Sequence, residues 1–153
     1  MIEIRPDDLT SPEMAALISA HARTMLAASP PESCHFLPID GLRHPSITVW
    51  GLWDDGELLG CGALRDLGDG TGEIKSMHTR EVARGRGLGR QMLEHILAEA
   101  KRRAYTALYL ETGSMDAFLP ARALYLRYGF AACGPFGDYA EDPNSLFMRL
   151  PLG

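Results

Sequence analysis

The pattern of hydrophobic and polar residues changes its period several times along the chain. Residues 2–5 alternate apolar and charged side chains like a short strand, and Ser11-Pro12 then supplies a helix cap with proline at the first helical position. Apolar residues next recur at helical spacing until Ser29-Pro30-Pro31 ends the pattern. These signals predict a strand, a helix, and a loop over residues 30–45 that has room for a helical turn.

The middle of the chain carries strand signals separated by tight turns. Residues 47–54 and 57–67 flank Asp55-Gly56, a dipeptide typical of two-residue hairpin loops, and a Gly-Asp-Gly turn leads into residues 73–79. The period then lengthens, because apolar side chains recur at helical spacing over residues 88–100. We therefore expect an antiparallel meander of strands followed by a helix.

Strand and helix patterns continue to alternate toward the C-terminus. Residues 107–112 are typical of a buried strand, residues 120–128 of a helix, and residues 130–136 and 145–150 of two final strands. Because strand, helix and strand follow one another, the strands at 73–79 and 107–112 should be parallel neighbours joined by a right-handed crossover. The order β-α-βββ-α-β-α-ββ predicts an α+β fold.

Composition fits one globular domain over residues 1–153, with 46% hydrophobic and 23% charged residues. Three separated cysteines indicate neither a disulfide framework nor a metal site. A net charge of −5 argues against binding to nucleic acid or to anionic membranes. The chain shows no apolar run long enough to span a membrane and no basic-then-apolar leader, so we expect a cytoplasmic protein.

A loop rich in glycine and arginine, Arg84-Gly85-Arg86-Gly87-Leu88-Gly89-Arg90, stands between a predicted strand and a predicted helix. Glycines let a ligand approach the backbone, and unpaired N–H groups at a helix start favour a phosphate. The loop lacks the Gly-Lys-Ser/Thr of a Walker motif and the G-x-G-x-x-G spacing of a dinucleotide site. It predicts an anion site, although the same residues could instead form only a helix cap with solvated arginines.

These residues resemble the GNAT family of N-acetyltransferases. The family pattern (Q/R)-x-x-G-x-(G/A) is present as Arg84-x-x-Gly87-x-Gly89, and Leu124-Tyr125 with Gly129-Phe130 is similar to a later family signature. The resemblance implies a mixed, mostly antiparallel sheet of about seven strands with helices on both faces, acetyl-CoA as co-substrate, and no metal. Four segments also resemble a bacterial subgroup labelled as indole-3-acetic acid acetyltransferases, and these are SPPES (29–33), GEIKSM (72–77), LETGSM (110–115) and EDPNS (141–145).

The resemblance assigns CoA-binding roles residue by residue. The family binds the CoA pyrophosphate on loop amides, pairs pantetheine with the open edge of the preceding strand, and encloses it near the later strand and helix. The matching positions are Arg84, Gly85, Arg86, Gly87, Leu88, Gly89 and Arg90 in the loop, Met77, His78 and Thr79 on the strand, and Thr112 beside the tunnel.

The chemistry requires a base and a proton donor. An amine with a pKa near 10.4 is almost fully protonated at pH 7, so a base helps to expose its lone pair. We predict Glu73 as that base, with Glu111 or a water chain as alternatives, and Tyr125 as the acid beside the departing thiolate. Glu73 could instead pair with Lys75 on a solvated face, and Tyr125 could serve packing alone. A strand amide near residues 77–79 would hold the oxyanion.

The acceptor should meet the loop at 30–45 and the last hairpin at 136–145, where Glu32 and His35 are candidates to bind it. Arg65 is a candidate for a substrate carboxylate. We expect direct acetyl transfer to the amine of a small molecule, or of a peptide, and the family suggests a homodimer. The alternative is a non-catalytic, acyl-CoA-binding regulatory module.

Overall fold

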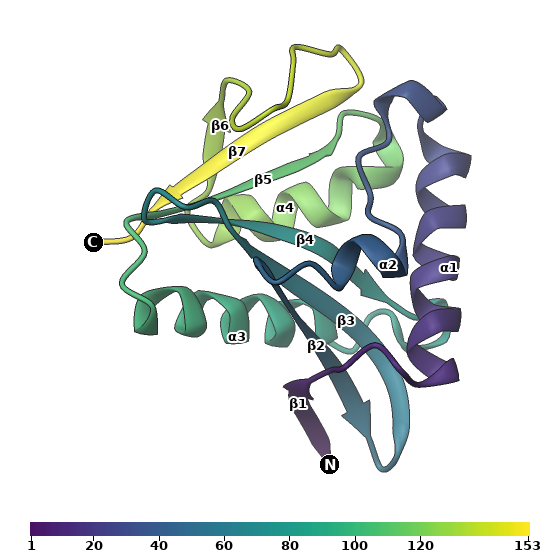
Figure 1. Ribbon diagram of the computed structural model, residues 1–153. Helices are drawn as coiled ribbons and strands as arrows, with labels where there is room; N and C mark the ends of the chain where they lie inside the picture. The colour runs from purple at the N-terminus through teal and green to yellow at the C-terminus, as the bar shows by residue number, and fades with distance from the viewer.

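The computed structural model describes all residues, 1–153, and contains one seven-stranded sheet (Figure 1). The spatial order is β1-β2-β3-β4-β5-β7-β6, and only β4 and β5 pair in parallel. This confirms the predicted α+β sheet and its parallel pair. The strands are β1 (Ile2–Pro6), β2 (Ile47–Asp54), β3 (Glu57–Asp66), β4 (Thr71–Thr79), β5 (Ala107–Gly113), β6 (Ala131–Cys133) and β7 (Ser145–Pro151).

Helices cover both faces of the sheet. One hydrophobic cluster joins α1 and α2 to the first face, and a larger cluster joins α3 and α4 to the second. No helix is both long enough and apolar enough to cross a membrane. The helices are α1 (Pro12–Ala28), α2 (Ile39–Leu42), α3 (Leu88–Arg102) and α4 (Leu119–Arg127).

Several local predictions hold, and one strand is shorter than expected. The Ser11 hydroxyl accepts a hydrogen bond from the amide of Met14 at 3.1 Å and so caps α1. The loop at 30–45 contains the short α2. The prediction of a strand over 130–136 was wrong in length, because β6 ends at Cys133; Gly134 and Pro135 follow, and proline has no amide hydrogen for a ladder.

Two glycines let α3 and its C-terminal connection pack closely on the sheet. A Cβ atom at Gly62 would lie 2.7 Å from Cγ of Met92, and a Cβ atom at Gly72 would lie 2.8 Å from the ring of Tyr105. Real Cβ contacts are longer than this, so a side chain at either glycine would push the layers apart.

The sheet opens between its two parallel strands. β4 pairs with β5 only from Thr71 to Ile74, and beyond that point it pairs with β3 alone. An irregularity in the β3–β4 register coincides with this point, and Ser76 there adopts a left-handed conformation with φ of 53°. Such a bulge bends a strand, and Figure 1 shows β4 and β5 diverging from their common start. The result is a gap in the middle of the sheet.

Candidate active site

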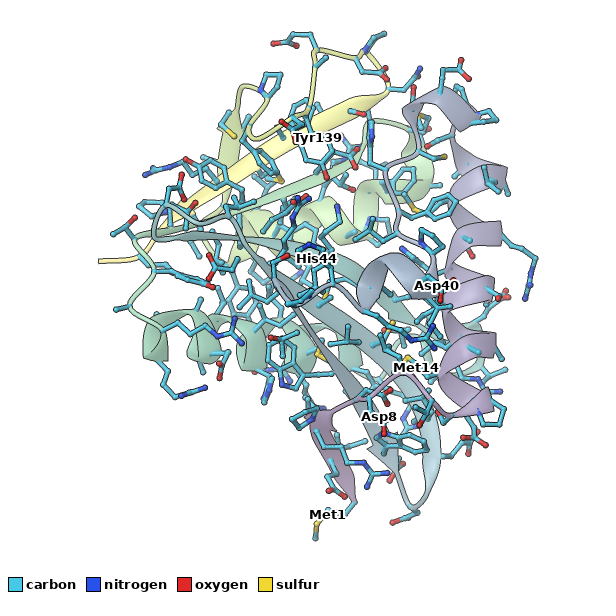
Figure 2. The ribbon with its side chains drawn as sticks, in the orientation of Figure 1. Met1, Asp8, Met14, Asp40, His44 and Tyr139 are labelled. Carbon is cyan, nitrogen blue, oxygen red and sulfur yellow. The ribbon has the colours of Figure 1, made fainter.

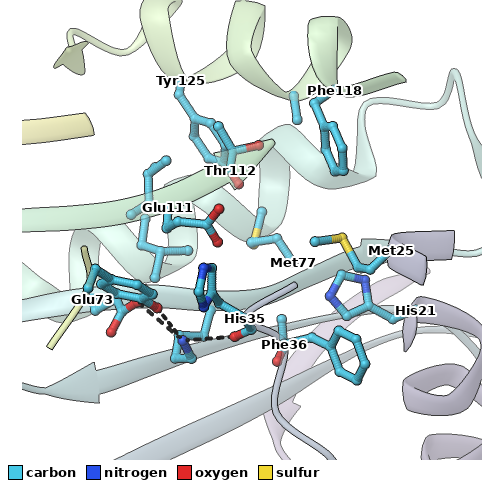
Figure 3. A pocket seen from close by; sticks show the side chains of 16 residues that line it. His21, Met25, His35, Phe36, Glu73, Met77, Glu111, Thr112, Phe118 and Tyr125 are labelled. Carbon is cyan, nitrogen blue, oxygen red and sulfur yellow. Dashed lines mark hydrogen bonds and ion pairs between the residues drawn. The ribbon is translucent and has the colours of Figure 1, made fainter. Parts of the chain in front are cut away.

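A small cavity of about 100 Å³ occupies the gap between β4 and β5 (Figure 3). Glu111 of β5 and Tyr125 of α4 both line it. The ring of Tyr125 belongs to the core under α3 and α4, whereas strand alternation places Glu111 on the other face of the sheet, together with Glu73 and Lys75. The gap therefore brings together side chains from both faces.

Glu111 presents a free carboxylate to this cavity. Figure 3 shows the carboxylate directed toward the centre of the lining residues, and no ion pair holds it. Burial raises the pKa of Glu111 to about 7, although hydrogen bonding by the Ser145 hydroxyl and the positive charge of Lys75 act to lower it. The negative charges of Glu73 and Asp142 add to the rise. A carboxyl group with this pKa exchanges a proton near neutral pH.

Glu73, by contrast, is paired through one carboxylate oxygen in a buried cluster. Its Oε2 accepts hydrogen bonds from the Tyr139 hydroxyl at 2.5 Å and from Nζ of Lys75 at 3.2 Å, and Nζ also donates to the Tyr139 hydroxyl at 2.8 Å. The side chains of Glu73 and Lys75 are only 2% and 7% exposed. The expected pairing of these two residues is present, but it lies in the interior and not on a solvated face.

Tyr125 offers an uncommitted hydroxyl at the inner end of the cavity. Its ring packs edge-on against Phe130, with ring centroids 5.7 Å apart, while its hydroxyl makes no hydrogen bond to another residue. Burial raises the pKa of Tyr125 to about 12, so the phenol keeps its proton at neutral pH. The position is suited to donating a hydrogen bond to a ligand.

A second cavity, of about 360 Å³, runs along the open edge of β4 and continues into the first. Six residues line both cavities, and these are His21, Met25, Met77, Phe118, Ala121 and Tyr125. Six of the residues predicted to bind CoA line this second cavity. They are Met77, His78 and Thr79 of β4, and Arg84, Leu88 and Gly89 of the glycine-rich loop. Thr112 lines the first cavity instead. The two spaces meet beside Tyr125.

The glycine-rich loop lies at the end of the second cavity, where Arg84, Leu88 and Gly89 line it. Gly85 and Gly87 have φ of 85° and 75°, a conformation that favours glycine, and α3 begins directly after Gly87 without a side-chain cap. The side chain of Leu88 is buried in the core. The first amides of α3 therefore keep their capacity to bind an anion.

The arginines of the loop are exposed and carry different partners. Nε of Arg84 donates to the carbonyl oxygen of Thr79 at 3.4 Å, whereas Arg86 pairs with Asp54 at 2.9 Å and Arg90 approaches Glu94 at 3.7 Å. Exposed pairs of this kind are weak, so these arginines can turn toward a phosphate at little cost.

A histidine pair connects α1 to β4 at the junction of the two cavities. Nδ1 of His21 lies 3.3 Å from Nδ1 of His78. Burial lowers the pKa of each to about 4, and the nearby charge of the other ring or of Arg84 adds to the effect. Both rings are therefore neutral at pH 7, so one can donate a hydrogen bond to the other.

The two predicted acceptor-binding residues lie in different surroundings. His35 lines the small cavity, and its ring packs edge-on against Tyr139 with centroids 5.0 Å apart. Glu32 is exposed on the short 3₁₀ turn before His35 and lines neither cavity. Neither His21 nor Tyr139 was predicted from the sequence, although an aromatic residue inside the polar segment 137–144 is a signal that could have marked Tyr139.

Comparison with known proteins gives consistent matches. Residues 14–130 match the family model described as the acetyltransferase (GNAT) family. The uncharacterized N-acetyltransferase YsnE of Bacillus subtilis is 50% identical over 151 residues, which cover 99% of this chain and 100% of that protein. An IAA acetyltransferase of Azospirillum brasilense is 44% identical over 124 residues, or 80% of each chain.

Solved structures share the whole fold. A Klebsiella pneumoniae protein described as an acyl-CoA N-acyltransferase superimposes with a TM-score of 0.81 at 31% identity, covering 100% of this chain and 99% of that one. An Elizabethkingia anophelis acetyltransferase, solved with acetyl-CoA bound, gives a TM-score of 0.72 at 23% identity and covers 99% of this chain and 98% of that one.

Proposed function

This chain belongs to the acetyltransferase (GNAT) family and is an N-acetyltransferase, and we propose that it transfers the acetyl group of acetyl-CoA directly to the amine of a small molecule. The observation that carries the proposal is the meeting of the two cavities beside Tyr125. A thioester that entered along β4 and an amine that entered from the other side would meet there without a covalent acetyl-enzyme.

The cofactor side of the proposal rests on backbone groups. The edge of β4 beyond Ile74 has no strand partner on the β5 side, so its amides and carbonyls are available to the amide groups of pantetheine. The uncapped start of α3 would hold the pyrophosphate, with Arg84, Arg86 and Arg90 adding charge. An amide near Met77 would stabilise the oxyanion.

We assign the general base to Glu111 in preference to Glu73. A base works best when its pKa lies near the operating pH, and burial brings Glu111 into that range. The lone pairs of Glu73 already accept two hydrogen bonds, one of them from a buried ammonium group. Glu73 thus supports a structural role, in which it anchors Lys75 and Tyr139 under the cavity.

Tyr125 would donate a hydrogen bond to the departing thiolate. With its pKa near 12 and a thiol pKa near 8.5, complete proton transfer would be uphill by roughly 5 kcal/mol, so stabilisation through a strong hydrogen bond is the favoured role. A module that only bound acyl-CoA would need neither this free hydroxyl nor a carboxyl group held near pKa 7.

The enclosure of the cavity favours a small acceptor over a protein. The loop that carries His35 is tied to the last hairpin, because the Ser33 hydroxyl donates a hydrogen bond to Asp142 at 2.6 Å. It is also tied to β4, because Nζ of Lys75 donates to the carbonyl oxygen of His35 at 3.5 Å. These contacts leave about 100 Å³ around Glu111, enough for an amine and a short chain.

The test is amine-dependent release of CoA thiol from acetyl-CoA across a panel of amines, amino acids, polyamines and peptides. We expect release with small amines and a loss of at least tenfold in kcat for Tyr125→Phe, with a smaller change in the KM for acetyl-CoA. Tyr128→Phe is the matched control, because Tyr128 directly follows the same helix and its hydroxyl donates a hydrogen bond to Glu94 at 2.6 Å, away from both cavities. Tight CoA binding with no amine-dependent release would favour the regulatory module.

A further inference from the structure

A broad groove on the outer side of the acceptor cavity is lined by Arg65, a cation that forms no ion pair with a protein carboxylate. The groove holds about 1070 Å³ and shares His35, Phe36, Glu73, Lys75 and Tyr139 with the small cavity. We infer that it binds the carboxylate of the acceptor through Arg65, so that the substrate is an amine with a carboxylate several carbon atoms away. This inference rests on the proposed function and specifies its substrate class.

Arg65 stands near the end of β3 with a half-buried side chain. It lines the groove, yet it takes part in no salt bridge and in no hydrogen bond with another residue. The guanidinium of Arg65 is thus open to a ligand, with five donors that make no bond within the protein. An incoming carboxylate can satisfy two of them in parallel.

None of the acidic groups that line the groove forms an ion pair with Arg65: Asp69 accepts hydrogen bonds from Thr71, and Asp138 is exposed to solvent. Glu73 is its direct cross-strand neighbour, but that carboxylate is bound by Lys75 and Tyr139. The carboxylate of Asp66 accepts a hydrogen bond from the amide of Gly68 at 2.8 Å and so stabilises the turn that follows β3. The positive charge of Arg65 therefore faces the groove without competition from its nearest neighbour.

Arg65 favours a carboxylate over a phosphate ester, because Asp66, Asp69, Glu73 and Asp138 also line the groove and a doubly charged phosphate would meet their repulsion. Lys75 also lines the groove, but its charge is balanced by Glu73. One uncompensated arginine matches one negative charge, and the fork of a guanidinium matches the planar geometry of a carboxylate. Aromatic side chains also line the groove, and they suit an apolar chain between the two polar ends of the substrate. These residues are Phe36, Tyr109, Phe136 and Tyr139. Figure 2 labels Tyr139 and His44, two residues that line the groove.

The register of the sheet sets the spacing between the two ends. Arg65 pairs with Glu73, Glu73 pairs with Tyr109, and Glu111 lies two residues farther along β5 on the same face. Two strand spacings and two residue steps separate the Cα atoms of Arg65 and Glu111 by roughly 12 Å. An amine at Glu111 and a carboxylate at Arg65 must thus be several bonds apart, as in an ω-amino acid and not in an α-amino acid.

The experiment compares 6-aminohexanoate with 6-aminohexanamide, its uncharged counterpart, as acceptors for the intact enzyme. We expect a higher kcat/KM for the carboxylate by about 10- to 100-fold, which is the factor given by one charge-assisted bidentate contact. Arg65→Gln should reduce this ratio to near one, and Arg65→Lys should retain part of it. Arg127→Gln, which removes an exposed charge on α4, should leave the ratio as it is in the parent enzyme.

The outcomes separate this inference from the proposed function. Acetylation of both probes with equal efficiency, or a preference for the carboxylate that survives in Arg65→Gln, would overturn the role of Arg65 while leaving the acetyltransferase intact. Thiol release with neither probe nor any other small amine would overturn the small-molecule acceptor itself. Preserved thermal stability of Arg65→Gln would exclude misfolding as the reason for a lost preference.

Discussion

The buried carboxyl group of Glu111 should make the wild-type protein less stable above neutral pH than a variant with an uncharged side chain at this position. Its pKa rises from an ordinary 4.5 in the unfolded chain to about 7 in the folded protein, so the folded state binds the proton more tightly. As the pH increases from 4.5 to 7, ionisation is progressively easier in the unfolded chain. Wild-type stability is therefore lost over this interval, and Glu111→Gln should remove the loss.

The size of the effect follows from the same values. A rise in pKa from 4.5 to about 7 corresponds to about 3 kcal/mol at high pH. Because the carboxyl group is partly exposed, solvent screening reduces this figure, and we expect about 1 to 3 kcal/mol. The stability of Glu111→Gln relative to wild type should therefore increase by that amount as the pH rises from about 5 to about 8. Its kcat should fall by roughly 10²- to 10⁴-fold.

Urea unfolding at the two pH values measures the stability, and thiol release measures the activity. Glu13→Gln, which changes an exposed carboxylate in the first turn of α1, is the control; it should leave kcat unchanged and lose at most about 1 kcal/mol of stability, opposite in sign to the gain at Glu111. A stability difference that is the same at both pH values would refute the burial argument. Full activity of Glu111→Gln together with loss of activity in a folded Glu73→Gln would return the base role to Glu73.

Three further predictions concern the buried groups around the site. His21→Gln should reduce the stability that the protein loses as the pH falls from 6.5 to 4. Burial lowers the pKa of His21 to about 4, so the folded protein resists protonation of this ring more than the unfolded chain does. Urea unfolding at about pH 5 and pH 7.5 tests this, and a loss as large as in wild type would contradict it. Lys75→Met should cost about 3–5 kcal/mol in urea unfolding by stranding Glu73, and adding Glu73→Gln should restore most of it, whereas additive losses would argue against the pairing. Gly72→Ala should lower stability by about 1–3 kcal/mol, because the new methyl group would clash with the buried ring of Tyr105. Gly134→Ala, where a Cβ atom would meet nothing, is the control and should change stability little. Equal melting temperatures for the two variants would refute the packing argument.

Much of the fold follows from local signals in the sequence. Ser11-Pro12 marks the start of α1, Asp55-Gly56 marks the β2–β3 turn, and the change to helical spacing after Gly87 marks α3. These signals act over a few residues, so a single sequence is enough to read them. The parallel pairing of β4 with β5 follows from the strand-helix-strand order, because a helical crossover returns the chain to the same end of the sheet.

The site itself depends on contacts that no local pattern records. Ser76 adopts a left-handed conformation that glycine normally supplies, so nothing in the sequence marked the bulge that opens the sheet. Tyr139 meets Glu73 across 66 positions of the chain. The choice between Glu73 and Glu111 then turns on burial and hydrogen bonding, which become visible only in the folded structure.

The central claim is that the amine attacks the thioester directly where the two cavities meet. Incubation of the enzyme with acetyl-CoA alone, followed by intact-mass measurement and thiol quantification, tests it most directly. The account predicts no acetylated enzyme and no thiol release until an amine such as 6-aminohexanoate is added. Thiol release equal to the enzyme concentration without amine, together with a mass increase of one acetyl group, would contradict it.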